Sequence, residues 1–449
     1  MGGFQDRRVV VVGGAVAGTA VARALVEEGA SVLLTEQRPE EELETAEELR
    51  TLGIDLAAGG HKPEHLDGAT LVVAAPGVTE RAPVLEWART RGIPVWGEME
   101  LGARLCDLPY LAVTGTNGKT TTTGMIESCL RADGIDAVAC GNIGRPFVTA
   151  ARESHDVLVV ECSSFQLQIQ ESFHPVVSVL LNLAPDHLDW HGSEGSYIAA
   201  KARVFARQRP GDTHVGNRDD PSAAAISARA PCDLVWFTQG EPAPGEVGFR
   251  GDGELVSKMG PEARMGSVEA GRAGYRADAA AAAAASLAFG AAADAVKHGL
   301  AAFRSARHRG DVVATVDGVK FVDNSKATNV HAATAAIDGV RDAVLIAGGR
   351  AKGVDLSPLR SRADHLKAVV VIGESAAELV RVFEGAVEVH TAGSIEEAVS
   401  TAFAVSRPGG TVLLAPACAS WDQFRDYEER GDRFAAAASA LSEEAVTHG

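Results

Sequence analysis

Short runs of aliphatic and β-branched residues alternate with helical patterns along most of the chain. This alternation is typical of parallel sheets covered by helices, so the pattern predicts an α/β fold. The expected strands are Arg8–Val12, Ser31–Thr35, Leu71–Ala75, Pro94–Trp96, Tyr110–Thr114, Ala137–Cys140, Val157–Glu161, Val176–Asn182, Ala343–Ala347, Ala368–Ile372 and Thr411–Ala415. The clearest helices are Thr19–Glu28, which Gly29 ends, and a segment that ends near Gly134.

The strands fall into three blocks. Polar or turn residues separate the blocks at Cys106–Pro109 and at Arg304–Arg309. A chain of 449 residues is also too long for one ordinary hydrophobic core. We therefore expect three domains, with boundaries at residues 1–107, 108–305 and 306–449.

Two segments depart from this alternation. Gln239–Gly271 is rich in Gly, Pro and Glu, which predicts surface loops or short antiparallel strands. Ala279–Ala285 is a run of alanine, the residue with the best helix propensity, so a buried helix is expected there.

The overall charge limits the classes of partner. With 46% hydrophobic and 23% charged residues the chain has the composition of a globular protein, and its formal net charge is −18. Such an acidic chain is not expected to bind nucleic acid or an anionic membrane. An anionic nucleotide would need local lysines, backbone amides and metal ions at its site.

The cysteines and the N-terminus indicate a cytoplasmic protein. The six cysteines are scattered without a C-x-x-C pair, as expected for reduced thiols. Strand-like sequence begins within the first ten residues, where a signal peptide would stand. Apolar runs are all shorter than the ~20 residues that span a bilayer.

The strongest motif is Gly115-Thr116-Asn117-Gly118-Lys119-Thr120, which connects an expected strand to an expected helix. Phosphate binding needs inward-pointing backbone amides, glycines that permit this geometry, and a helix N-terminus. Lys119 is then expected to lie along the β- and γ-phosphates, and the Thr120 hydroxyl to face Mg²⁺. Val113 stands where the standard P-loop has its first glycine, so the match is to a shorter loop.

A second glycine-rich turn, Gly13–Gly18, also joins a strand to a helix. A dinucleotide fingerprint would have glycine in place of Ala15, although Glu36 stands at the right distance to meet a ribose. The turn supports a nucleotide-binding fold without indicating a nicotinamide cofactor.

Polar residues gather after two further strands of the second block. Glu161 ends one apolar strand, where parallel sheets bind ligands, and is a candidate Mg²⁺ ligand. Asp186, His187 and Asp189 follow the next strand, as a metal and phosphate site would require. Lys201 lies on an expected helix, where a solvated side chain is the ordinary alternative.

The order of these motifs resembles that of the Mur ligases over essentially the whole chain. The motifs that carry the resemblance are Gly115–Thr120, Gly141–Gly144, Glu161–Leu167, Asn182–Asp189, Ala199–Lys201, Asn324–Asn329, Gly348–Gly353 and Pro416–Phe424. The last three are similar to the family members that add D-glutamate. The resemblance implies an N-terminal Rossmann-like UDP-binding domain, a central P-loop-type ATPase domain and a C-terminal Rossmann-like domain that binds the amino acid.

The resemblance also implies a function. It is the ATP- and Mg²⁺-dependent formation of an amide bond between UDP-N-acetylmuramoyl-L-alanine and D-glutamate through an acyl phosphate, in cytoplasmic peptidoglycan synthesis. A monomer is expected.

By the same resemblance, each group of site residues has a role. The ATP site is expected to contain Gly115, Thr116, Asn117, Gly118, Lys119, Thr120, Thr121, Arg309 and Asn324. The UDP substrate is assigned to Gly13, Gly18, Glu36, Gln37 and Asn142, and D-glutamate to Thr328, Lys352, Ser420 and Tyr427. The metal ligands are expected to be Thr120, Glu161, His187 and a carbamylated Lys201, and the catalytic residues Lys119, His187 and Lys201.

The chain departs from the family pattern at two places. The third-block motif usually begins with Asp, but here Asn324 follows Asp323. Where the family has a His-Asn-x-x-Asn pattern at the adenine, this chain has Gly274-Tyr275-Arg276-Ala277-Asp278. A changed adenine contact is therefore expected.

Three alternatives remain open. Another amino-acid ligase of the superfamily, such as a folylpolyglutamate synthase, would differ in the amino acid it accepts. A nicotinamide oxidoreductase would use the N-terminal glycine turn, which Ala15 disfavours. A non-catalytic nucleotide-binding regulator would not need Lys119, Glu161, His187, Lys201 and Lys352 together.

Overall fold

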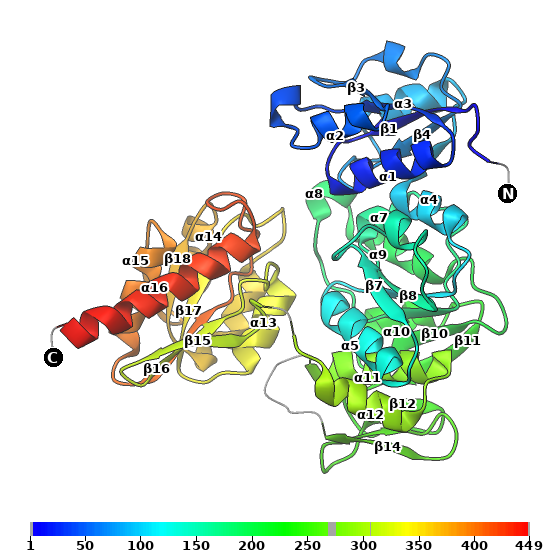
Figure 1. The fold of residues 1–449 in the computed structure, drawn as a ribbon. Coiled ribbons are helices and arrows are strands. Elements are labelled where there is room, and N and C mark those ends of the chain that lie inside the picture. Colours follow the sequence, from blue (N-terminus) through cyan, green and yellow to red (C-terminus); the bar gives the residue numbers. More distant parts are fainter. Residues whose placement is uncertain (1–2, 268–274, 306, 448–449) are drawn as a thin grey trace. The chain divides into compact units, whose positions relative to one another are not determined.

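The computed structural model describes residues 3–267, 275–305 and 307–447, which form two compact units. The first unit contains residues 3–183, 195–267 and 277–303, and the second contains residues 184–194, 275–276, 304–305 and 307–447. Figure 1 labels their helices and strands. None of the described helices has both the length and the apolar character needed to cross a membrane.

The first sheet is parallel throughout, with the strand order β3-β2-β1-β4-β5. Its strands are β1 (Arg8–Val12), β2 (Ser31–Thr35), β3 (Asp55–Ala57), β4 (Leu71–Ala74) and β5 (Val95–Gly97). Its helices are α1 (Val16–Glu27), η1 (Glu40–Glu42), α2 (Ala46–Thr51), η2 (Pro63–Leu66), α3 (Pro83–Thr90) and α4 (Glu98–Leu105). Because β2 and β4 lie on opposite sides of β1, the strand order reverses there, and parallel sheets bind ligands at such a point.

The second sheet has nine strands in the order β14-β13-β12-β11-β10-β9-β6-β8-β7. The strands are β6 (Tyr110–Thr114), β7 (Ala137–Gly141), β8 (Val157–Glu161), β9 (Val177–Leu180), β10 (Thr213–Asn217), β11 (Asp233–Phe237), β12 (Glu246–Phe249), β13 (Glu254–Ser257) and β14 (Ala263–Ser267). The pairs β12–β13 and β13–β14 are antiparallel and the other pairs are parallel.

The helices between β6 and the third sheet vary widely in length. They are α5 (Lys119–Ala132), α6 (Phe147–Ala150), α7 (Ser164–Gln168), α8 (Leu188–His191), α9 (Glu194–Ala202), η3 (Arg203–Phe205), α10 (Pro221–Ser227), α11 (Tyr275–Phe289) and α12 (Ala293–Ala302).

The third sheet has the strand order β15-β16-β20-β17-β18-β19, and only its β15–β16 pair is antiparallel. The strands are β15 (Asp311–Val316), β16 (Val319–Asp323), β17 (Ala343–Gly348), β18 (Leu366–Ile372), β19 (Glu388–Thr391) and β20 (Gly410–Leu414). The helices are α13 (Val330–Asp338), η4 (Ser357–His365), α14 (Ala376–Phe383), α15 (Ile395–Ser406) and α16 (Tyr427–Thr447).

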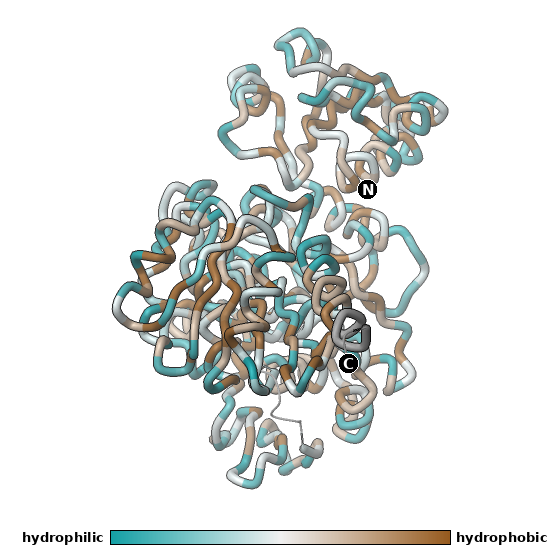
Figure 2. The backbone as a smooth tube through the Cα atoms, turned by 90° about the vertical axis from the view of Figure 1, so that its left-hand side faces the viewer, coloured by the Kyte–Doolittle hydropathy of each residue, from teal (hydrophilic) through white to brown (hydrophobic). Residues whose placement is uncertain are grey.

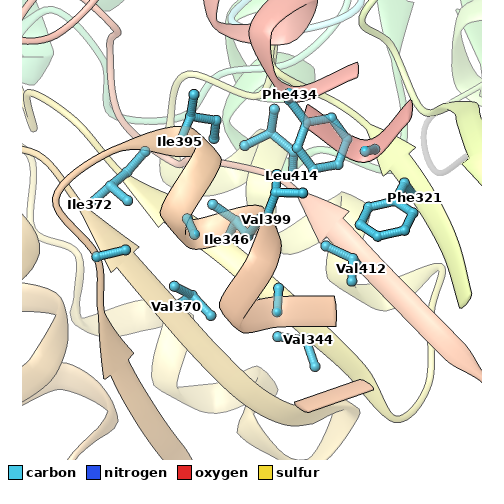
Figure 3. Close-up of a cluster of buried hydrophobic side chains, with 14 of the residues drawn as sticks. Phe321, Val344, Ile346, Val370, Ile372, Ile395, Val399, Val412, Leu414 and Phe434 are labelled. Carbon is cyan, nitrogen blue, oxygen red and sulfur yellow. The ribbon is translucent and has the colours of Figure 1, made fainter. Parts of the chain in front are cut away.

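Apolar side chains on both faces of the third sheet make its core. On one face Ile395 and Val399 of α15 and Phe434 of α16 pack against strand residues such as Ile346 and Val370 (Figure 3). A second cluster, which includes Phe383 of α14, covers the opposite face. In Figure 2 many outer loops of the tube are coloured hydrophilic, and the hydrophobic stretches lie mainly further inside.

The α/β fold is therefore confirmed. The sequence pattern did not predict the strands β3, β10, β11, β15, β16 and β19, and the other differences lie at element ends. The helix expected at Thr19–Glu28 begins earlier, as α1, because the last three residues of the Gly13–Gly18 segment are already helical. The strand expected at Val176–Asn182 is shorter, since Asn182 leaves the sheet to bind the phosphate loop. The expected antiparallel strands are β12–β14, and residues 268–271 lie outside the described residues.

Candidate active site

The glycine turn after β1 is held closed by Glu36. The Gly14 amide donates a hydrogen bond to Glu36 Oε2 at 2.6 Å, and Arg38 binds the same carboxylate. Burial favours the neutral acid, but the hydrogen bonds from Arg38 and Gly14 outweigh it and lower the pKa of Glu36 to about 2. Gly18 allows α1 to approach the turn, since a Cβ there would lie 1.8 Å from the Gly13 oxygen.

Glu36 thus shapes the turn from inside, while Gln37 beside it is exposed. Their contact with the UDP substrate stays a prediction.

The phosphate loop after β6, Gly115–Thr120, is braced by Asn182, which follows β9, and by Tyr197 of α9. The Asn117 amide donates to Asn182 Oδ1 at 2.8 Å, and Asn182 Nδ2 donates back to the Asn117 oxygen at 3.1 Å. The Thr116 hydroxyl lies 2.8 Å from the hydroxyl of Tyr197. Hydrogen bonds to Asn182 and Tyr197 thus hold the backbone of the loop in place.

Two lysines meet at the backbone of this loop. Lys119 Nζ donates to the carbonyl oxygens of Gly115 and Thr116 at 3.0 and 2.9 Å. Lys201 Nζ donates to the same Gly115 oxygen at 2.7 Å and lies 4.8 Å from the centre of the Tyr197 ring. Lys201 is only 2% exposed, so the solvated alternative is wrong for this residue.

Glu161, at the end of β8, carries a buried carboxylate. Its Oε1 accepts a hydrogen bond from Asn142 Nδ2 at 2.8 Å, whereas Oε2 is buried and has no hydrogen-bond partner. A bare carboxylate oxygen is costly to bury unless a cation completes it. The residue therefore fits a Mg²⁺ ligand. Nowhere in residues 3–267, 275–305 and 307–447 do three His, Cys, Asp or Glu side chains form a metal cluster.

Asp278 of α11 lies directly against the phosphate loop. A Cβ on Gly118 would be 2.1 Å from Asp278 Oδ1, and the same oxygen lies 3.4 Å from the Thr122 hydroxyl. Gly118 has a φ of 84° and cannot be replaced here without strain. The departure from the family pattern at residue 278 therefore places a carboxyl group against this loop. Gly274 lies outside the described residues.

Asp278→Asn is expected to lower the KM for ATP about 5-fold. The reason is that the substitution removes the repulsion between the Asp278 carboxylate and the ATP phosphates, which is worth roughly 1 kcal/mol when such charges lie a few ångströms apart near the surface. Wild type is expected to accept GTP as well as ATP, since phosphate contacts carry most of the binding. Initial rates with both nucleotides at saturating Mg²⁺ check this. Asp294→Asn, on the exposed face of α12, is the control. An unchanged KM for ATP would show that Asp278 does not oppose the phosphates.

In the second unit, the Asp186 carboxylate contacts three side chains, two of which were predicted to be site residues. Lys352 Nζ donates to Asp186 Oδ1 at 2.6 Å, Asn329 Nδ2 donates to Oδ2 at 3.1 Å, and His187 Nε2 lies 3.6 Å away. Burial alone would raise the pKa of Asp186, but the charge of Lys352 outweighs it and lowers that pKa. The lysine expected to bind a substrate carboxylate thus already binds one in this chain. Both Lys352 and His187 have positive φ, of 58° and 52°.

Two of the other residues assigned to D-glutamate lie in loops after strands of the third sheet, and one lies at the start of a helix. Thr328 follows β16, Ser420 is buried after β20, and Tyr427 begins α16. Lys326 Nζ lies 3.7 Å from the centre of the Tyr427 ring. Burial raises the pKa of Tyr427 to about 12, so its hydroxyl stays protonated.

The assigned Asn324 donates its backbone amide to the Leu414 oxygen, and Arg309 is partly buried in the preceding loop. Asp323, just before Asn324, binds His308 at 2.6 Å and the Ser325 amide at 2.9 Å, so it holds this loop from inside.

Sequence reasoning gave no role to Tyr197, Asn329 or Arg430. Asn329 ends the recognised motif Asn324–Asn329, and Tyr197 stands one turn before Lys201. Arg430 lies in a charged run, where burial has no signal in the sequence.

Three family models match the chain in succession. The Mur ligase MurD-like N-terminal domain matches residues 7–97, the Mur ligase middle domain residues 113–253, and the Mur ligase glutamate ligase domain residues 308–418.

Similar proteins cover nearly the whole chain. The UDP-N-acetylmuramoylalanine–D-glutamate ligase of Pelotomaculum thermopropionicum is 41% identical over 442 residues, or 96% of this chain and 97% of that protein. The protein of the same name from Frankia casuarinae is 43% identical over 446 residues, or 96% and 94%. The solved MurF ligase of Thermotoga maritima in complex with ADP shares the fold, with a TM-score of 0.62, 16% identity and coverage of 92% and 95%. On the strength of the family models and these long matches, the chain belongs to the Mur ligase family.

Proposed function

We infer that this protein joins D-glutamate to UDP-N-acetylmuramoyl-L-alanine by an amide bond, with conversion of ATP to ADP and phosphate. Relatives that are 41% and 43% identical over 96% of the chain carry the name of that activity. The observation in the structure that supports it best is the braced phosphate loop, at which Lys119 and Lys201 share the Gly115 carbonyl.

The chemistry follows from charge. The alanyl carboxylate attacks the γ-phosphate of ATP, which gives an acyl phosphate and ADP. Two anions must approach, so Lys119 has to leave the loop carbonyls and stabilise the charge between them. The D-glutamate amine then attacks the acyl carbon, and inorganic phosphate leaves. The ammonium must first lose a proton, for which His187 is a candidate base.

Mg²⁺ would be held by Glu161, Thr120, His187 and a carbamylated Lys201. When bound, it would neutralise charge on the phosphates. The unpartnered Oε2 of Glu161 supports this assignment.

The remaining assignments are also proposals. We assign the UDP moiety to residues 1–107, ATP to 108–305 and D-glutamate to 306–449, with Gly13, Gly18, Glu36, Gln37 and Asn142 at the first substrate. We further propose a cytoplasmic monomer that supplies peptidoglycan precursors and binds neither nucleic acid nor membrane, in keeping with the net charge of −18.

One assay tests the proposed function. Phosphate release with UDP-N-acetylmuramoyl-L-alanine is expected to be at least ~100-fold faster with D-glutamate than with L-glutamate, because a misplaced amine loses about that much rate. The same assay with a panel of amino acids separates this ligase from other members of the superfamily. Equal rates for the two enantiomers, or a preference for another amino acid, would contradict the assignment.

A further inference from the structure

Arg430 of α16 is completely buried, with 0% exposure. Its Nε donates to Ser325 Oγ at 2.9 Å and its Nη2 donates to the Ser325 oxygen at 2.8 Å. Its Nη1 donates to the oxygens of Cys418 and Gly348 at 3.2 and 3.5 Å. In the described part of the chain, no carboxylate lies within ion-pair distance of this guanidinium.

A buried cation that binds only carbonyl and hydroxyl oxygens has a large desolvation cost in the folded state. Burial lowers the pKa of Arg430 to about 10, so the group remains charged at neutral pH. A hydrophobic side chain of similar volume would often stabilise such a core better. The hydrogen bonds therefore point to a role beyond overall stability.

The partners of Arg430 lie at or just after the carboxyl ends of three different strands, where three loops begin. Ser325 follows β16, Gly348 ends β17, and Cys418 follows β20. These strands are adjacent and parallel, in the order β16-β20-β17, so their carboxyl ends meet at one edge of the sheet. One guanidinium thus fixes the spacing of all three loops.

The same loops carry the proposed amino-acid contacts. Thr328 stands three residues after Ser325, Lys352 four after Gly348, and Ser420 two after Cys418. Further bonds link the loops, since the Ala417 amide donates to the Ala327 oxygen at 2.9 Å.

We propose that Arg430 is a positioning residue for the D-glutamate site, which sets the spacing of Thr328, Lys352 and Ser420 through the loop carbonyls without touching the substrate. Because four of its N–H groups already have partners and none of the side chain is exposed, a direct contact is excluded. The proposal rests on the proposed function. Asn324, assigned to ATP, is held separately by its bond to the Leu414 oxygen.

Arg430→Lys keeps the charge but cannot reach all three loops. Its KM for D-glutamate is expected to rise at least ~10-fold, as the loss of hydrogen bonds to a charged group predicts. The KM values for ATP and for the UDP substrate are expected to stay within about 2-fold. Ser325→Ala removes the hydroxyl that accepts from Arg430 Nε and donates to the Tyr427 oxygen, and should raise the KM for D-glutamate about 5-fold. This variant keeps the proposal testable if Arg430→Lys fails to fold.

Arg433→Lys is the matched control, because Arg433 lies one turn further along α16 and pairs with Glu396 at the surface. It should leave every KM unchanged. Thermal unfolding of each variant is measured alongside. An unchanged KM for D-glutamate in both test variants, or an equal rise for all three substrates, would overturn the proposal. If wild type itself released no phosphate with D-glutamate, the proposed function would fail instead.

Discussion

Replacing Lys201 by alanine or by arginine is expected to lower turnover by on the order of 10²–10³ while the protein folds normally. Removal of one contact that stabilises transition-state charge typically costs that much. Lys201 is buried, and its Nζ lies 2.7 Å from the Gly115 oxygen of the phosphate loop. A lysine that has captured CO₂ presents a carboxylate there, which supports a divalent cation.

Lys201→Arg distinguishes a carbamylated lysine from a lysine that acts as a plain cation. A guanidinium keeps its positive charge and does not capture CO₂, so Lys201→Arg should fail if the carbamate is required. Full activity of Lys201→Arg would show that the residue acts as a plain cation.

The measurement is phosphate release by wild type, by both variants, and by Lys201→Ala with added acetate. Acetate should restore part of the rate, because its carboxylate can occupy the vacated anion position. Lys297→Arg is the matched control, since Lys297 is exposed on α12 and should behave as wild type. Surface substitutions of this kind usually change stability by under ~0.5 kcal/mol.

The strands that could be predicted from the sequence are those buried on both faces. β1, β2, β6 and β8 have the predicted ends, because continuous aliphatic runs are typical of central parallel strands. β10 was missed since it contains His214 and Asn217, whose polarity conceals a buried strand. His214 is held there between the hydroxyls of Ser178 and Ser227, at 2.7 and 2.9 Å.

The active-site loops were equally accessible to sequence reasoning, because each is a local motif between a strand and a helix. The tertiary contacts that bring these motifs together could not be predicted from the sequence. The pair Asp186–Lys352 joins residues 166 positions apart, and the Arg430 contacts join α16 to three separate loops. Asp278 was noticed as a departure from the family pattern, but only the fold places its carboxylate against Gly118. Such contacts depend on tertiary packing, which periodicity does not encode.

Glu161→Gln is expected to lower turnover by on the order of 10²–10³ and to raise the Mg²⁺ concentration needed for half-maximal rate. The change keeps the shape of the side chain and can preserve the 2.8 Å hydrogen bond with Asn142, but it removes the charge that a cation needs.

The thermal stability of Glu161→Gln without Mg²⁺ is not expected to fall with its turnover. Glu161 is 1% exposed, and its Oε2 has no hydrogen-bond partner, so the charged group is a cost to the folded protein without Mg²⁺. The neutral amide reduces that cost. The thermal unfolding temperature of Glu161→Gln without Mg²⁺ is therefore expected to equal or exceed that of wild type.

Titration of phosphate release against Mg²⁺ and thermal unfolding with and without Mg²⁺ give the two readouts. Glu86→Gln, on the exposed face of α3, should leave both as in wild type. A variant that loses activity and unfolds at a much lower temperature would mean that Glu161 is needed for folding. A variant that keeps full turnover with an unchanged Mg²⁺ dependence would remove Glu161 from the metal site. Lost turnover together with a raised Mg²⁺ requirement, in a protein at least as stable as wild type, is the outcome expected of a metal ligand, because a structural carboxylate would affect stability and not the Mg²⁺ dependence.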